Sequence, residues 1–164
     1  MTGLIIIPSK RSYTVKIFEH TLNIFAASVI LFFFFPWFTI GNTVSFSGAT
    51  LPQGAKNLHI MTSGLHTPFP SLILLTYVVY LVPITAFIII VTDSIVKERE
   101  KSRNINRFLA CIPLAACIVS LLYFFITGGA GAMNSMSPGA YLTCAAALFL
   151  IPAAFGVIRT GSDR

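Results

Sequence analysis

Few side chains in this sequence could take part in chemistry, and their spacing does not match a known type of reactive site. The cysteines Cys111, Cys117 and Cys144 all lie inside apolar runs, without a CxxC pair or zinc-type Cys/His spacing. His59 and His66 share a segment, residues 41–71, that contains neither Asp nor Glu, so a metal ion there would need other ligands. We therefore expect no metal site and no cofactor.

Acid–base catalysis would need carboxylates or imidazoles placed together. The one adjacent pair is Glu19 and His20, which precedes the first long apolar stretch and which we interpret as a pair at a membrane boundary. Asp93 and Asp163 are poor candidates for a catalytic dyad, and no GxSxG or HExxH motif is present. The sequence predicts a protein without enzymatic activity.

The most charged stretch is KEREKSRNINR, residues 97–107. If it is helical, Arg99, Arg103 and Arg107 share one face at i, i+4 and i+8. Such a face could bind anionic lipid headgroups or an acidic partner. The alternative is a solvated turn that only fixes the membrane topology. No aromatic interleaving or nucleic-acid-binding module accompanies these arginines, so we expect no nucleic-acid partner.

The elements that must position these residues are apolar and of bilayer length. The chain is 55% hydrophobic and 10% charged, with a mean hydropathy of +0.84; soluble domains average about 25% charged residues. About 20 helical residues cross a hydrocarbon core of about 30 Å. Four stretches without Asp, Glu, Lys, Arg or His meet this length: approximately Thr21–Ile40, Leu72–Val91, Phe108–Thr127 and Ala140–Ile158. We predict an all-α integral membrane protein, a single domain over residues 1–164, built as an antiparallel bundle of four transmembrane helices.

The positions of the cations predict the orientation. Ten of the eleven Lys and Arg residues fall on one side of the four stretches, and only Lys56 falls on the other. The positive-inside rule then places both termini and the loop 92–107 in the cytoplasm, with outer loops at 41–71 and 128–138. The short chain and the lack of glycosylation sequons in these outer loops favour a bacterial inner membrane.

The outer loops carry little signal beyond a possible strand. Residues 43–47 alternate polar and apolar side chains, which predicts a short strand, with a hypothetical partner strand within residues 55–61. Trp37 falls near the outer end of the first stretch, where we expect it to anchor the membrane interface. The glycine-rich residues 128–138 are expected to form a flexible connector.

Small residues predict how the helices pack, because membrane helices associate through close contacts. In the fourth stretch a 4-3-4-3 spacing yields one stripe that should face the other helices: Ala140, Cys144, Ala147, Ile151 and Ala154. Ser137 followed by Pro138 fits the start of this helix. Pro83, Pro113 and Pro152 could bend their helices, since proline removes a backbone hydrogen bond.

The predicted layout resembles that of claudins, which have four spans, both ends inside and a long first outer loop. The resemblance covers topology only, because that loop has neither the cysteine pair nor the tryptophan motif of claudins. Intramembrane charge, which ion-coupled transporters use, is lacking in the four stretches. We expect an accessory or structural subunit of a larger membrane complex, with membrane lipids and other membrane-protein subunits as partners. The alternatives are a binder or carrier of lipid or another apolar molecule, and a small immunity or pore-forming protein.

Overall fold

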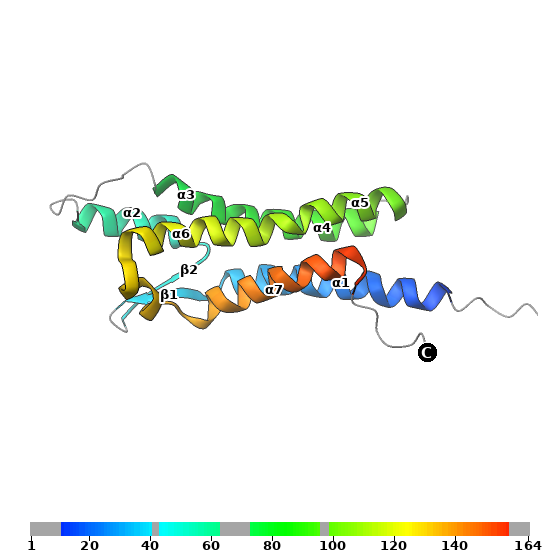
Figure 1. Ribbon diagram of the computed structural model, residues 1–164, viewed down its shortest axis with the longest axis horizontal. Coiled ribbons are helices and arrows are strands. Elements are labelled where there is room, and N and C mark those ends of the chain that lie inside the picture. The colour runs from blue at the N-terminus through cyan, green and yellow to red at the C-terminus, as the bar shows by residue number, and fades with distance from the viewer. Residues whose placement is uncertain (1–10, 41–42, 63–72, 96–98, 158–164) are drawn as a thin grey trace, which may run out of the picture.

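The computed structural model describes residues 11–40, 43–62, 73–95 and 99–157, and most of these are helical. In chain order the elements are α1 (Arg11–Phe33), β1 (Pro36–Ile40), β2 (Val44–Ser47), α2 (Leu51–Thr62), α3 (Ile73–Tyr77), the 3-10 helix η2 (Val78–Tyr80), α4 (Leu81–Ile95), α5 (Arg99–Leu109), α6 (Cys111–Asn134) and α7 (Pro138–Phe155). Figure 1 shows the long helices side by side, with α1 and α7 forming one layer and α4, α5 and α6 the other.

The two ends of this bundle differ in what they contain. The strands β1 and β2 and the residues 135–137 lie at one end, which we call the strand end (Figure 1). The start of α1, the junction of α4 with α5 and the end of α7 lie at the other, which we call the arginine end. The long helices run between these two ends, whereas α2 lies at the strand end (Figure 1).

Three helical stretches in the described part of the chain are long and apolar enough to cross a membrane. They are Leu74–Ile95, through α3, η2 and α4; Ser102–Ile126, through α5 and α6; and Pro138–Phe155, which is α7. In α1 the apolar helical part is shorter, Thr21–Phe33. Membrane-length apolar helices are thus confirmed for the second, third and fourth predicted stretches.

The first stretch was expected to stay helical to Ile40, and this is wrong. The helix ends at Phe33, and the chain continues as the strand Pro36–Ile40. Proline disfavours helical backbone in the residue before it, and the Trp-Phe-Thr-Ile run that follows favours a strand. The backbone N–H groups of Phe34 and Phe35 bond three residues back, to Leu31 and Phe32, which closes the helix.

The predicted strand at 43–47 is confirmed as β2, but the predicted partner at 55–61 is wrong. That segment lies in α2, whereas β2 pairs antiparallel with β1, with Phe38 opposite Phe46 and Ile40 opposite Val44. The register is irregular between Pro36 and Phe38, which makes Trp37 the extra residue of a bulge-like step.

Two predicted loops are largely helical. Within 92–107, α4 extends to Ile95 and α5 begins at Arg99. Within 128–138, α6 continues to Asn134, so the expected flexible connector is a helix despite its glycines. The flexible connector is a wrong prediction, whereas the helical alternative for the basic segment is confirmed from Arg99. Hydropathy marks where a helix enters polar surroundings and not where its hydrogen bonds end.

Prolines coincide with the irregular points of the helices. Pro83 cannot donate to the carbonyl of Val79, and the 3-10 turn η2 lies just before it. Pro113 cannot donate to the carbonyl of Leu109, and there α5 ends and α6 begins, joined through a bond from Ala110 N–H to Asn106 O of 2.9 Å. Pro152 lies inside α7, which continues to Phe155.

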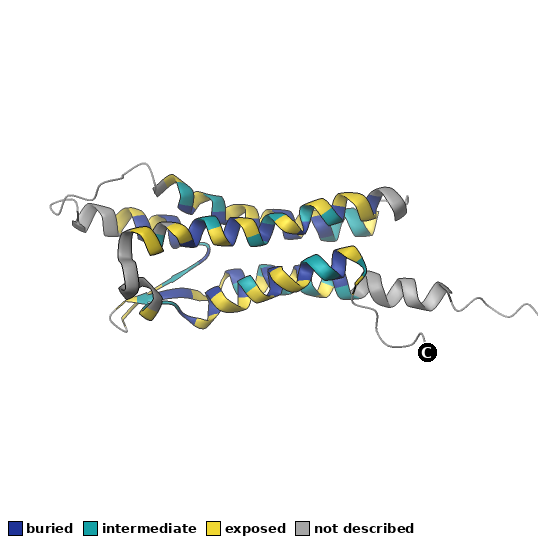
Figure 2. Ribbon diagram, in the orientation of Figure 1, coloured by how far each residue is buried: buried dark blue, intermediate teal, exposed yellow. Residues whose placement is uncertain are grey.

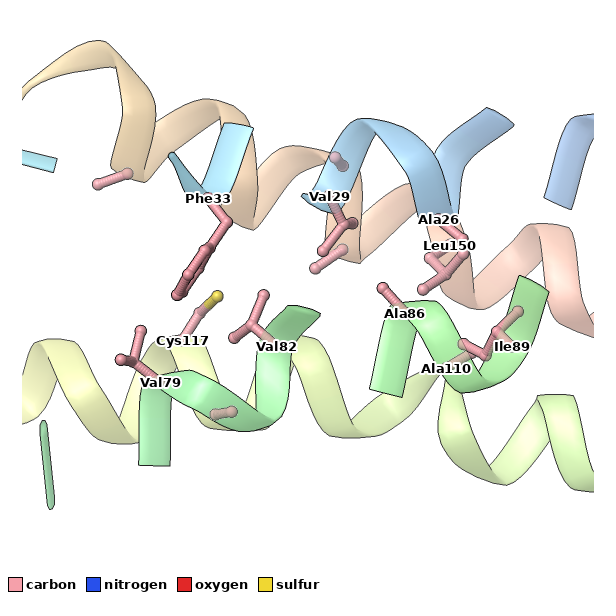
Figure 3. Close-up of a cluster of buried hydrophobic side chains, with 14 of the residues drawn as sticks. Ala26, Val29, Phe33, Val79, Val82, Ala86, Ile89, Ala110, Cys117 and Leu150 are labelled. Carbon is pink, nitrogen blue, oxygen red and sulfur yellow. The ribbon is translucent and has the colours of Figure 1, made fainter. Parts of the chain in front are cut away.

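The core follows a seven-residue spacing on each long helix. On α1 the buried side chains recur every three or four residues, and the buried side chains of α4, α6 and α7 follow the same spacing. Small and branched side chains from these helices meet along the bundle axis (Figure 3). The buried apolar side chains of α1 are Leu22, Ala26, Val29 and Phe33, and those on and before α4 are Val79, Val82, Ala86 and Ile89. Figure 2 shows the opposite helix faces exposed, and those faces are apolar as well.

Candidate functional site

The segment 135–137 completes the strand end by pairing with the free edge of β1. Thr39 N–H donates to the Ser135 carbonyl and Ser137 N–H donates to the Trp37 carbonyl, both at 2.8 Å. Phe38 and Met136 form the bridge between them. One short strand is thereby held on both sides, by β2 and by the residues that lead into α7.

Side-chain hydroxyls reinforce this pairing. Thr39 Oγ1 lies 2.8 Å from Ser137 Oγ and 3.2 Å from Ser45 Oγ. Ser137 occupies the N-cap position of α7, with extended backbone angles and Pro138 after it, as the sequence predicted. Its hydroxyl makes no capping bond, however, and is used instead to join α7 to the sheet.

Glycine permits the close approaches on which the strand end depends. A Cβ on Gly139 would lie 2.3 Å from the Pro36 carbonyl oxygen, and one on Gly48 would lie 2.6 Å from the Phe33 ring. A Cβ on Gly54, in α2, would lie 2.4 Å from the Phe46 ring. Backbone packs directly against backbone at Gly139, so the start of α7 and the turn after α1 fix each other's position.

Trp37 is part of this packed region. Its side chain is 0% exposed and meets the Phe33 ring edge to face, with ring centres 6.1 Å apart. The indole Nε1 is buried without a hydrogen-bonding partner in the described structure. The structure places the ring against protein, while the interface-anchoring role stays a prediction.

The predicted packing stripe lies close to the most buried line of α7. Ala140, Ala147 and Ala154 are buried, whereas Cys144 and Ile151 are half-buried. The fully buried neighbours of those two are Thr143 and Leu150, so the buried line runs 140, 143, 147, 150 and 154. Thr143 can be buried there because its hydroxyl donates a hydrogen bond to the Gly139 carbonyl of the same helix, at 2.7 Å.

Among the cysteines, two come together across helices. Cys117 of α6 is buried, and its thiol lies near that of the half-buried Cys144 on α7. Cys111 is exposed. Within the described residues no group of three or more His, Cys, Asp or Glu side chains could hold a metal ion. His66 lies outside the described residues, as does the side chain of His59.

At the arginine end, a polar bond joins α1 to α4. Asn23 Nδ2 donates to Asp93 Oδ2 at 3.0 Å, in a half-buried position. The Asn23 Oδ1 atom is buried and has no partner in the described structure. The two residues are 70 positions apart, and no pattern in the sequence links them.

A second polar pair lies on α5. Ser102 Oγ donates to the Thr92 carbonyl at 3.4 Å, and Asn106 Nδ2 donates to Ser102 Oγ at 3.5 Å. Asn106 is only 2% exposed, and its Oδ1 atom has no partner among the described residues. The signal for its burial was in the sequence, because Ser102, Asn106 and Ala110 recur every four residues and continue into the apolar line of α6.

The three predicted arginines all belong to α5, which confirms that the segment is helical. The side chain of Arg99 lies outside the described residues, and that of Arg103 is exposed. Arg107 is half-buried, with its guanidinium carbon 5.5 Å from the centre of the Phe155 ring of α7. Its Nε atom is buried and lacks a hydrogen-bonding partner in the described structure.

Comparison with models of protein families, with curated proteins and with solved structures gives no match.

Proposed function

We propose that this protein is an integral membrane protein that crosses the bilayer four times and serves as a non-catalytic subunit of a larger membrane complex. In this proposal α1 supplies the crossing that precedes the three membrane-length stretches. The arginine end faces the cytoplasm, since ten of the eleven cations belong to that side, and the strand end faces outward.

The observation that carries the subunit role is an exposed apolar pair at the strand end. Ile40 and Val44 lie opposite each other in the sheet and are 39% and 49% exposed. The strand end lies at the ends of the membrane-length helices (Figure 1), where Phe38 stacks on Phe124 of α6, so in the proposed topology this pair lies at the outer boundary of the lipid tails. Contact with another protein would cover it, and the tight packing around Gly139 holds it in place.

The apolar helix surfaces support the same role. Only 33%, 35% and 44% of the three membrane-length windows are buried. Lipid can cover the apolar surface that is not buried. The helices of a partner can replace part of that lipid, because the surface remains in apolar surroundings either way.

Native mass measurement after gentle detergent extraction tests the subunit role. We expect a particle that contains the 17.8 kDa chain together with a second protein in constant ratio. Val44→Lys should remove that partner, whereas Gln53→Lys, which adds the same charge at an exposed position of α2, should retain it. A chain that always extracts without a second protein would contradict the proposal.

Reporter insertions test the membrane topology independently. A reporter active only outside the cytoplasm should be active after Ser63 and inactive after Glu98 or at the C-terminus. The opposite pattern would contradict the proposed orientation.

Lipid binding is the second candidate function. The observation that favours it is the half-buried guanidinium of Arg107, whose Nε atom has no hydrogen-bonding partner in the described part of the chain.

A further inference from the structure

We infer that Arg107, backed by the Phe155 ring, binds the phosphate of an anionic phospholipid at the arginine end. The inference rests on the proposed topology, which places this end of the bundle at the cytoplasmic leaflet, and it deepens the lipid-binding candidate by naming the ligand and the residue.

The contact between Arg107 and Phe155 does not use the N–H groups of the guanidinium. The Arg107 guanidinium carbon lies 5.5 Å over the centre of the Phe155 ring, close enough for the ring to attract the cation. An aromatic ring makes no in-plane hydrogen bonds to the N–H groups of the fork. A phosphate can accept from these N–H groups in the guanidinium plane, in the paired geometry that arginine favours.

One donor of Arg107 has no partner among the residues that the structure describes. This donor is the buried Nε atom. A buried donor without a partner costs free energy, and a donor that carries part of a positive charge costs more. An anion bound to the other N–H groups of the guanidinium would offset part of this cost by pairing with its charge.

The depth of Arg107 matches that of lipid phosphates. The membrane-length stretch Ser102–Ile126 has more residues than the about 20 that cross a hydrocarbon core of about 30 Å, so its first residues can lie at the boundary. Arg107 lies within the first two turns of this stretch, and Phe155 is the last residue of α7. Both side chains therefore lie at the cytoplasmic boundary, where anionic headgroups are found. Arg103, one turn earlier and exposed, lies farther towards the cytoplasm.

The test is competition between two lipids for the purified full chain. The protein in detergent is incubated with equal amounts of phosphatidylglycerol and phosphatidylcholine, and native mass spectra record which lipid is retained. We expect phosphatidylglycerol to be retained about fivefold or more over phosphatidylcholine, because only its headgroup has a net negative charge to pair with arginine. In Arg107→Gln this preference should fall to near equality.

Arg103→Gln is the matched control, since it removes the same charge from the same helix at an exposed position. It should keep at least half of the wild-type preference. An equal loss in both variants would show a general charge effect and overturn the inference, as would a wild-type protein without a preference. If Arg107→Gln does not fold, Arg107→Lys and Arg103→Lys replace the pair: only the first should lower the preference, and equal retention in both overturns the inference.

Inorganic phosphate distinguishes the two sources of the anion. Added at matched ionic strength, it should leave phosphatidylglycerol bound, and complete displacement would assign the site to free phosphate and overturn the lipid assignment. The same spectra record any protein partner. A spectrum without a protein partner would contradict the subunit proposal, and a spectrum without a lipid preference would contradict the lipid site. The two failures can therefore be distinguished.

Discussion

At the strand end, hydroxyl groups bond to one another, whereas at the arginine end several buried polar atoms have no partner among the described residues. Thr39, Ser45 and Ser137 form a chain of hydroxyls 2.8 and 3.2 Å apart, on top of backbone pairing. Four buried side-chain atoms lack a partner in the part of the chain that the structure describes, and three of them lie at the arginine end, in Asn23, Asn106 and Arg107. From this comparison we expect the strand end to be the more rigid of the two, and we expect changes at the arginine end to cost less.

The rigidity of the strand end is tested most severely at Gly139. Gly139→Val should lower the free energy of unfolding by about 2–3 kcal/mol, because its Cβ would overlap the Pro36 carbonyl and backbone cannot move aside without breaking the sheet. Unfolding in mixed detergent measures this change. Gly54→Ala is the control, with a smaller loss expected because the Cβ would meet the half-buried Phe46 ring, which can rotate. Equal effects would show that the strand end yields as readily as a side chain does.

The polar contact between α1 and α4 provides the next largest effect. Asn23→Ala and Asp93→Ala should each destabilise the protein, and a double-mutant cycle should yield a coupling energy of about 1 kcal/mol for their 3.0 Å hydrogen bond. We expect Asp93→Ala to cost more than Asn23→Ala, because Asp93 makes a further interaction. A coupling energy near zero would mean that the arginine end does not depend on this bond.

Asn106 tests whether an unpaired atom is a cost to the fold. Asn106→Leu should raise the free energy of unfolding by up to about 1 kcal/mol, since a side chain of similar size replaces a buried amide whose Oδ1 atom has no partner. Ser102→Ala, which removes only a 3.5 Å contact to that amide and a 3.4 Å contact to the Thr92 carbonyl, should change stability less. Destabilisation by Asn106→Leu would instead indicate that a bound water or ligand satisfies the Oδ1 atom.

The smallest effect is expected from the hydroxyl chain. Ser137→Ala should lower the free energy of unfolding by about 0.5–1 kcal/mol, because it removes the 2.8 Å contact to Thr39. No helix-capping bond is lost, since the Ser137 hydroxyl makes none. Ser45→Ala, at the exposed end of the chain, should stay within about 0.5 kcal/mol of wild type. A larger cost at Ser45 than at Ser137 would reverse the order that burial predicts.

Much of the helical framework was predictable, and the errors fall where hydropathy is ambiguous. The apolar stretches near 72–91, 108–127 and 140–158 were located because they have bilayer length and no charge. The first was extended too far, since Trp37 to Ile40 are as apolar as the helix before them. Apolar content cannot distinguish a buried strand from the end of a membrane helix.

The candidate site was only partly predictable. The shared helix of Arg99, Arg103 and Arg107 followed from their four-residue spacing. Arg107 is half-buried near Phe155, whereas Arg103 is exposed. This difference depends on where α7 ends beside α5. Residues separated by almost fifty positions carry no local pattern that links them.

The sequence alone determined where this chain is apolar, how long its helices must be and on which side its charge gathers. Those properties follow from composition and from the rise of a helix, which are local. Only the tertiary structure decided that β1 pairs with both β2 and residues 135–137, that Trp37 is enclosed, and that Asn23 meets Asp93. These contacts join distant parts of the chain, and their partners are chosen by packing and hydrogen-bond geometry in three dimensions.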